Sequence, residues 1–391
     1  MHAFNHDPLL SRFVSEYILS ELPETAAGLE APDTLNMLGC AYCKRYEQEQ
    51  NPSDLERGMA ALEKGVQLAV RPSDTWRYCV NNLGNALRMQ FMQSQNPRVL
   101  DRAIHYFGQL TEHTPPDADD LPEHLHNLCS CLLQRYNLTH DQADIDRAIR
   151  AWQEIRRKTQ ATTPYRQLYL ENLITGLSMR HVLTHNFADL HEANQVCKEL
   201  LQELSPSHPE RATYVEQLTE GMVKYYRHTG HNSDLRDAMR TWEHLIEQTP
   251  KDAEYLPALI NFYVFGYLER FAQTDDEDEL EHALHWQEYA LSLCPPGSFY
   301  LPQCQYNLGT GLFLRYCNHD PSGAPDDLDR AIELLEDALA HIATRDKRMP
   351  NVYRSVLADA LRHRFERTEN MADLAWAQRL EREIQSESVP E

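Results

Sequence analysis

Apolar residues follow a helical spacing along most of the chain, and this spacing repeats with a fixed period. In one repeat Leu83 and Leu87 belong to an apolar stripe, and Leu100 and Ile104 begin a second stripe 17 residues later. The leading position of the first stripe returns every 45 residues, at Leu38, Leu83, Leu128, Leu173, Leu218, Tyr263 and Leu308. The leading position of the second stripe keeps the same step, at Leu55, Leu100, Ile145, Leu190, Leu235 and Leu280. Two markers in phase at this period are typical of a stack of identical supersecondary units.

Each unit is predicted to contain a helix, a loop, a second helix and a turn. A carboxylate directly precedes the second stripe in most units, at Asp54, Asp144, Asp189, Asp234, Asp327 and Asp373. This carboxylate can cap the free N–H groups at the start of the second helix and complement its dipole. Prolines follow that helix, where the chain has to turn, at Pro115, Pro250, Pro295 and Pro350. Strand-like alternation does not recur, so the sequence predicts an all-α protein.

The spacing inside the unit distinguishes between repeat families. A period of 45 residues by itself fits HEAT or armadillo repeats, for which roughly 40–47 residues is usual, better than the roughly 34 of tetratricopeptide repeats. However, Leu83-Gly84 in the first helix, and Ala103 followed by Phe107 and Pro115, resemble the tetratricopeptide signature. The extra length falls mainly between the Leu-Gly segment and the Ala. The sequence therefore resembles a series of long tetratricopeptide repeats.

This resemblance implies a right-handed superhelical solenoid of about eight tetratricopeptide-like hairpins over residues 35–384. Residues 1–34 are expected to supply a capping helix and lead-in, because Leu9–Leu19 is amphipathic and terminal units need a cover. Residues 385–391 are expected to form a disordered tail. The segment 318–325 adds three residues to the seventh unit, either as a tolerated insertion or as a partner-contacting loop. Aromatic residues four positions after the repeat Ala are predicted to be buried between units, at Phe107, Trp152 and Trp242.

Three segments carry a more specific resemblance. Leu308–Tyr316, Asp327–Ile332 and Leu361–Thr368 combine Leu-Gly-x-x-Leu-x-x-Arg-Phe/Tyr, a short polar loop and Asp-Leu-x-x-Ala-Ile. Together they resemble the repeat region in front of CHAT (caspase-like) peptidase domains, over about residues 35–380. The resemblance implies a role beside such a peptidase or in a related prokaryotic-type defence assembly. Because no segment matches the catalytic His and Cys motifs of that family, no catalytic residue is carried over.

Composition narrows the classes of partner and compartment. The formal net charge of −23 leaves little basic surface, so we expect no direct nucleic acid and no membrane as a partner. We find no signal peptide and no apolar stretch of membrane-spanning length, which favours a cytoplasmic protein with its nine cysteines reduced. Cys40-x-x-Cys43 and Cys129-x-Cys131 are spaced like zinc ligands, but the four ligands of a structural site are not assembled. We expect no metal and no cofactor.

The sequence contains no recognisable catalytic motif. His124-x-His126 and His181-x-x-x-His185 have ligand-like spacing without the Glu of a His-Glu-x-x-His motif. A Gly-rich phosphate loop, a nucleophile elbow and a Rossmann fingerprint are absent. We therefore predict that the protein is not an enzyme. An enzyme whose site is assembled in the groove from several repeats is the alternative.

In tetratricopeptide repeats the first helix of each unit lines the concave groove, and the resemblance implies the same here. Two polar rows, two residues before and after the Leu marker, supply candidate partner-binding residues, together with an arginine one turn further on: Asn36, Asn81, Asn85, Arg88, His126, Glu171, Glu216, Glu220, Asn261 and Tyr306. Such rows fit a solvated groove and equally fit any exposed helix face. Asn side chains can pair with the donor and the acceptor of an extended peptide, and Arg88 can hold a carboxylate. The acidic Glu171, Glu216 and Glu220 favour a neutral or basic partner.

The sequence thus predicts a binding scaffold or adaptor that holds a partner protein or peptide in its groove. A companion or regulator of a caspase-like peptidase is the sharper version of this prediction. A protein-contacting subunit of a ribonucleoprotein effector is a further alternative. The identity of the partner does not follow from the residues.

Overall fold

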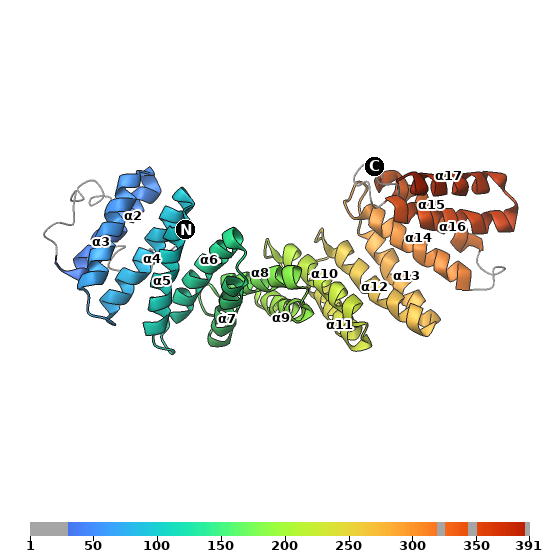
Figure 1. The fold of residues 1–391 in the computed structure, drawn as a ribbon. Coiled ribbons are helices and arrows are strands. Elements are labelled where there is room, and N and C mark those ends of the chain that lie inside the picture. Colours follow the sequence, from blue (N-terminus) through green and yellow to red (C-terminus); the bar gives the residue numbers. More distant parts are fainter. Residues whose placement is uncertain (1–29, 319–324, 343–349, 388–391) are drawn as a thin grey trace. The chain divides into compact units, whose positions relative to one another are not determined.

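A computed structural model describes residues 30–318, 325–342 and 350–387 (Figure 1). Within these ranges the chain forms sixteen helices, arranged as eight pairs, and no strand. The first helices of the pairs are α2 (Pro32–Glu49), α4 (Asp74–Ser94), α6 (Leu121–Thr139), α8 (Arg166–Thr184), α10 (Arg211–Thr229), α12 (Leu256–Thr274), α14 (Leu301–Asn318) and α16 (Pro350–Thr368). The second helices are α3 (Pro52–Leu68), α5 (Pro97–His113), α7 (Gln142–Lys158), α9 (Phe187–Glu203), α11 (Asn232–Gln248), α13 (Glu277–Ser292), α15 (Pro325–Ile342) and α17 (Met371–Glu387). The predicted all-α series of eight hairpins is confirmed.

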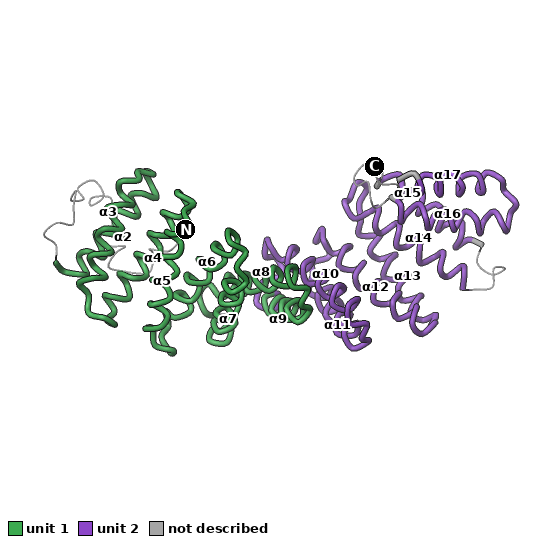
Figure 2. The backbone as a smooth tube through the Cα atoms, in the orientation of Figure 1, with its two compact units in different colours: residues 1–200 green, residues 201–391 purple. Residues whose placement is uncertain are grey.

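The helices group into two compact units, residues 1–200 and 201–391, which divide within α9 (Figure 2). In the first unit each helix from α2 to α8 packs on the next one, and in the second unit the same holds from α10 to α17. First helices of neighbouring pairs also touch directly, as α2 touches α4 and α10 touches α12. In the described ranges, every helix is too short or too polar to cross a membrane. The successive packing of the helix pairs makes the described chain an all-α repeat solenoid.

Three of the sequence predictions concern residues outside the described ranges. The amphipathic segment Leu9–Leu19, most of the insertion 318–325 and the last four residues of the tail fall there. Within the described ranges the first helix begins at Pro32 and the last one ends at Glu387, so residues 385–387, expected to be disordered, are helical.

The aromatic residues that follow the repeat Ala are buried, as predicted. Phe107, Trp152 and Trp242 have exposed fractions of 0 %, 1 % and 0 %. A glycine of the Leu-Gly pair makes room for one of these rings, because a Cβ on Gly84 would lie 2.5 Å from the ring of Phe107. A side chain at this position would therefore push α4 and α5 apart.

The second helices begin with a cap that the sequence analysis placed three residues too late. The side chain of Asn51 accepts a hydrogen bond from the Ser53 N–H at 3.1 Å, which is the geometry of an N-cap. The corresponding caps in other pairs are Asn96, Asp141, Asn186, Asp276 and Asn370. The predicted cap Asp54 lies in the first helical turn, where its charge complements the dipole but its side chain bonds elsewhere.

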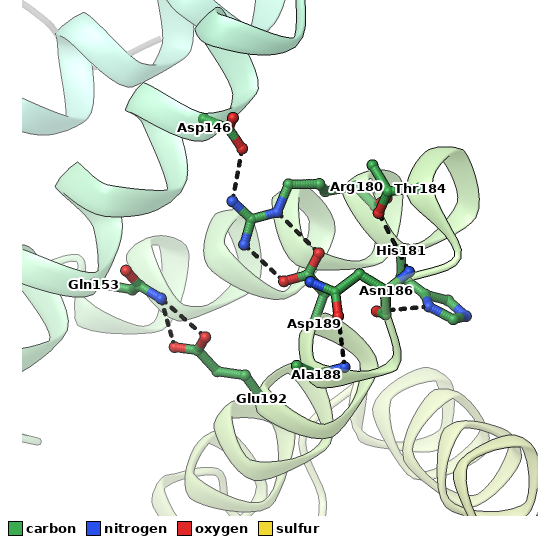
Figure 3. Close-up of polar contacts among 9 residues, drawn as sticks. All are labelled: Asp146, Gln153, Arg180, His181, Thr184, Asn186, Ala188, Asp189 and Glu192. Atoms are coloured by element: carbon green, nitrogen blue, oxygen red, sulfur yellow. Dashed lines mark hydrogen bonds and ion pairs between the residues drawn. The ribbon is translucent and has the colours of Figure 1, made fainter. Parts of the chain in front are cut away.

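In five of the eight pairs the aspartate of the first turn instead pairs with an arginine near the end of the preceding helix. Figure 3 shows Arg180, whose Nε and Nη2 donate to the two carboxylate oxygens of Asp189 at 2.9 and 2.6 Å. Its Nη1 also donates to Asp146 of the preceding pair, at 2.7 Å. We call this two-pronged contact the Arg–Asp clasp; it recurs at Arg45–Asp54, Arg135–Asp144, Arg315–Asp327 and Arg364–Asp373.

The Arg–Asp clasp joins the two helices of a pair and often the neighbouring pair as well. Arg135 also reaches Asp101 at 2.8 Å, and Arg315 also reaches Glu281 at 3.0 Å. In the second pair Gln90 and Val99 take the places of the two clasp residues, so that pair lacks the contact. The Arg315–Asp327 clasp keeps its geometry although 12 residues rather than nine separate its partners.

A residue in the left-handed conformation ends the first helix of most pairs. The N–H of Gln50, with φ of 55°, donates to the carbonyl of Tyr46 at 2.8 Å. The residues with φ between 52° and 64° at this position are Gln50, Gln95, His140, His185, Gly230, Asp275 and Glu369. Only one of them is glycine, the residue for which this conformation carries no steric cost.

Candidate functional site

The predicted partner-binding residues all lie on first helices, but they differ widely in exposure. Asn36 and Asn85 are buried, with exposed fractions of 5 % and 3 %. Glu216 and Glu220 are exposed. The others are half-buried, namely Asn81, Arg88, His126, Glu171, Asn261 and Tyr306. The expectation of a uniformly solvated row is therefore wrong at Asn36 and Asn85.

Two of these asparagines hold neighbouring pairs together. Asn82 Nδ2 donates to Asn36 Oδ1 at 2.9 Å, and Asn127 Nδ2 donates to Asn81 Oδ1 at 3.1 Å. Each bond links the first helices of two successive pairs, so these amide oxygens already have a partner within the fold. The sequence analysis missed the donors, although an Asn recurs directly before the Leu marker at Asn82, Asn127, Asn172 and Asn307.

Asn85 is different because neither its Nδ2 nor its Oδ1 has a hydrogen-bond partner among the described residues. A buried amide without partners costs roughly 1–3 kcal/mol for each unsatisfied group. Native proteins leave few such groups, so a buried amide without a partner marks this part of α4 as a candidate contact for a ligand. One turn further along α4, Arg88 Nη1 approaches Asn127 Oδ1 at 3.5 Å, a long contact that leaves most of its donors uncommitted.

His126 on α6 adds a second incompletely bonded group to this face. Its Nδ1 is buried and finds no partner in the described part of the chain, and its Nε2 lies 3.5 Å from Ser130 Oγ. Burial and the nearby charge of Arg88 lower the pKa of His126 from 6.5 to about 4. The ring is therefore neutral at pH 7. Its centroid lies 5.2 Å from that of Tyr169 on the next first helix.

Apolar side chains continue the α4 stripe at both ends. Tyr78 and Met92 are 53 % and 62 % exposed, and they lie at helical spacing from Asn85. Together with Asn81, Asn85, Arg88 and His126 they form what we call the α4–α6 face. This face combines two exposed apolar side chains with a central group of polar side chains, of which Asn85 and the Nδ1 of His126 are unpaired within the described residues.

The remaining candidates are already engaged or simply exposed. Glu171 accepts from Gln167 Nε2 at 2.7 Å, and Glu220 accepts from Lys224 at 3.1 Å. Asn261 Oδ1 accepts from Gln287 Nε2 at 3.0 Å. Tyr306 stacks on Tyr353 with ring centroids 4.0 Å apart. None of these contacts brings the second-unit candidates into one polar cluster.

The cysteine pairs of the sequence belong to the core. Cys40, Cys43, Cys129 and Cys131 are all buried, and burial raises the pKa of Cys43 to about 12. Across the described ranges, no group of three or more His, Cys, Asp or Glu side chains is arranged to hold a metal ion.

No protein-family model matches this chain, and no curated protein matches it. Solved structures do resemble it. A putative kinesin light chain with tetratricopeptide-like repeats from Podosopora anserina shares 12 % identity and a TM-score of 0.37, over 55 % of this chain and 95 % of that one. A tetratricopeptide repeat protein from Parabacteroides merdae shares 13 % identity and a TM-score of 0.34, over 84 % of this chain and 99 % of that one.

Two further solved structures come from proteins of other kinds. A signal transduction ATPase with a tetratricopeptide repeat sensor, from Pyrococcus horikoshii, shares 12 % identity and a TM-score of 0.42. The match covers 91 % of this chain and about half, 47 %, of that protein. Human IFIT1 bound to PPP-AAAA shares 14 % identity and a TM-score of 0.28, over 90 % of this chain and 73 % of that one. At these identities the likeness concerns the fold alone.

Proposed function

We propose that this solenoid is a protein-binding scaffold and that the α4–α6 face receives an extended segment of its partner. One observation carries the proposal: Asn85 is buried, and both polar atoms of its side chain are unpaired within the described residues. The fold thus carries a cost of roughly 1–3 kcal/mol per unpaired group that a leucine of similar volume would not incur. A bound partner recovers this cost by completing the hydrogen bonds.

The chemistry of Asn85 fits a polypeptide backbone. A primary amide offers a donor and an acceptor about as far apart as the C=O and N–H of an extended residue, so one side chain can bind both. The neutral His126 ring and Arg88 lie within the same face, and exposed Tyr78 and Met92 can cover apolar side chains of the partner. A phosphate backbone would instead call for several cations, and this face supplies one.

The charge of the chain favours a neutral or basic partner. The formal net charge is −23, and exposed Glu216 and Glu220 add to the acidic surface of the second unit. Long-range attraction of this kind accelerates association more than it strengthens the final complex. Salt should therefore slow binding without abolishing it.

A finer proposal concerns the biological setting. The motifs in Leu308–Tyr316, Asp327–Ile332 and Leu361–Thr368 resemble repeats found in front of CHAT peptidase domains. This supports a non-catalytic regulator or companion of a caspase-like peptidase, acting in the cytoplasm. The specific test is whether a purified CHAT peptidase from the same genome binds this protein, and whether its cleavage rate changes.

The general proposal can be tested with defined probes. An array of short peptides, grouped as basic, neutral and acidic, would be tested for binding by fluorescence anisotropy, with an adenine-rich RNA oligomer as a separate arm. We expect basic or neutral peptides to bind, and Asn85→Leu to weaken them by roughly tenfold, the equivalent of about 1.4 kcal/mol. Circular dichroism of the variant would confirm an intact fold.

Two results would contradict the proposal. If the RNA oligomer binds and none of the peptide classes does, the protein has a nucleic-acid function instead. Peptide binding that Asn85→Leu leaves unchanged would place the binding site on another surface. Turnover of a bound compound would instead support the alternative of an enzyme.

A further inference from the structure

Two thiols approach each other closely in the second unit. The sulfur atoms of Cys294 and Cys304 lie 3.8 Å apart, where the chain passes from the end of α13 to the first turn of α14. Cys304 is fully buried and Cys294 is half-buried. A disulfide requires about 2.05 Å between its sulfurs, a distance that small side-chain rotations can reach from here.

The two thiols are chemically unequal. The hydrogen bond between the two sulfur atoms lowers the pKa of Cys294 from 9.0 to about 7, against the effect of burial, and a hydrogen bond with Ser298 lowers it further. The same sulfur–sulfur contact and burial raise the pKa of Cys304. Other buried thiols behave as inert core groups, since burial raises the pKa of Cys79 and Cys197 to about 12.

Small molecules can approach Cys294 from the surface. A cavity of about 470 Å³ is lined by Leu293, Pro295 and Ser298, the residues next to Cys294 and the serine that bonds to it. Lys251, from the turn before α12, also lines this cavity. Cys294 itself is not part of the lining, but its side chain is only half-buried, which leaves it accessible to a molecule as small as a peroxide.

We propose that Cys294 and Cys304 form a redox modification site, in which hydrogen peroxide converts the two thiols into an intramolecular disulfide. The Cys294 thiolate attacks one peroxide oxygen, an S–O bond forms, the O–O bond breaks and the leaving hydroxide takes up a proton to become water. Cys304 sulfur then attacks the resulting sulfenic acid. The S–S bond forms, the S–O bond breaks, and the hydroxyl leaves as water with the Cys304 proton. The two thiols are oxidised, and one peroxide is reduced to two waters.

A hydrogen bond links Cys304 to Asn261, one of the predicted partner-binding residues on the first helices. In the reduced form Cys304 Sγ donates to Asn261 Oδ1 at 3.7 Å, and Gln287 Nε2 donates to the same oxygen and to the Cys304 carbonyl. Oxidation removes the thiol proton and leaves Asn261 with the Gln287 bond. The redox inference does not depend on partner binding by the α4–α6 face, which belongs to the other unit.

The experiment treats the reduced full-length protein with graded hydrogen peroxide, blocks free thiols and maps peptides without reduction. We expect a species lighter by two hydrogens whose peptides link Cys294 to Cys304, reversed by dithiothreitol. Cys304→Ser should stop at the sulfenic acid, which dimedone traps on Cys294. Cys294→Ser should yield neither product, and the exposed Cys317 provides the matched control, since Cys317→Ser should oxidise like the wild type.

Several outcomes would overturn the inference. It is wrong if Cys317 is oxidised before Cys294, if Cys294 proceeds to the sulfinic acid without linking to Cys304, or if dimedone labels Cys294 in the wild type as strongly as in Cys304→Ser. Because Cys304 lies in the core, its variant can misfold. The peptide map of the wild-type protein decides the question in that case.

Discussion

Two regions of the molecule differ in how their buried polar groups are paired. One is the edge that carries the Arg–Asp clasps, which we call the clasp edge, and the other is the α4–α6 face. At the clasp edge a buried carboxylate such as Asp189 meets a two-pronged guanidinium partner, and the contact recurs from pair to pair. On the α4–α6 face, Asn85 is buried to the same degree, but both polar atoms of its amide are unpaired within the described residues. Full pairing at regular positions is what stability selects. A binding site can instead retain buried polar atoms without hydrogen-bond partners, at the expense of stability.

The largest expected effect tests the clasp edge. Arg180→Ala leaves the carboxylate of Asp189, 3 % exposed, without its cation, and we expect a loss of roughly 3–5 kcal/mol. The matched control is Gln90→Ala, at the equivalent position of the pair that lacks a clasp, which should cost well under about 1 kcal/mol. Urea unfolding of both variants measures the difference. Equal losses would show that the Arg180 clasp contributes no more to stability than Gln90 does.

A second test uses pH to act on the α4–α6 face. The folded pKa of His126 is about 4 and its ordinary value is 6.5, so the unfolded chain binds the proton more readily. Stability from the neutral ring is complete above pH 6.5 and is lost as pH falls toward 4, by up to about 3 kcal/mol. Neighbouring His124, also lowered to about 4 by burial, contributes in the same direction. Thermal unfolding of the wild type and of His126→Asn should therefore converge as pH falls, and parallel curves would contradict this assignment.

The third test compares the two buried asparagines. Asn85→Leu removes unpaired polar atoms at nearly constant volume, so it should stabilise the fold by roughly 1–2 kcal/mol. Asn36→Leu deprives Asn82 of its buried acceptor and should destabilise the fold by a similar amount. Denaturant midpoints give both signs directly. If Asn85→Leu also destabilises, its amide has a partner that the described residues do not supply.

The smallest expected effect concerns the left-handed residues of the clasp edge. His185 has φ of 53°, and His185→Gly should stabilise by up to about 1 kcal/mol, because relief of strain outweighs the added freedom of the unfolded chain. Gly230→Ala, at the equivalent position of the next pair with φ of 64°, should destabilise by about 1 kcal/mol. Thermal midpoints of the two variants should move in opposite directions. A shift in the same direction would mean that contacts of the side chain decide the preference.

The sequence was sufficient for the helices because their determinants are local and repeated. Leu83, Gly84 and Phe107 recur in kind, and their spacing alone predicts two packed helices per period. The start of the second helix was misassigned by three residues, because both Asn51 and Asp54 are good capping residues and only the backbone shows which one accepts the N–H. Arg315 and Arg364 belong to the Leu-Gly-x-x-Leu-x-x-Arg motif segments, but the sequence alone did not show that each of them pairs with an aspartate across the loop.

The binding face was less predictable because it depends on neighbours distant in the sequence. Asn36 and Asn85 occupy the two equivalent polar rows, yet one is paired and the other is not. The difference arises from Asn82, 46 residues beyond Asn36. Periodicity assigns a residue to a face, whereas the side chain of the adjoining repeat decides whether that residue remains available.

The Arg315–Asp327 clasp has a practical consequence for engineering this molecule. It forms with the same two-pronged geometry across a connection three residues longer than elsewhere, so the pairing of α14 with α15 does not depend on the length of the connecting chain. Lengthening a loop whose ends are already fixed costs little, since each doubling adds only about 0.6 kcal/mol. This connection is therefore the natural place to graft a fluorescent or affinity module, giving a reporter that leaves both helices of the pair unchanged.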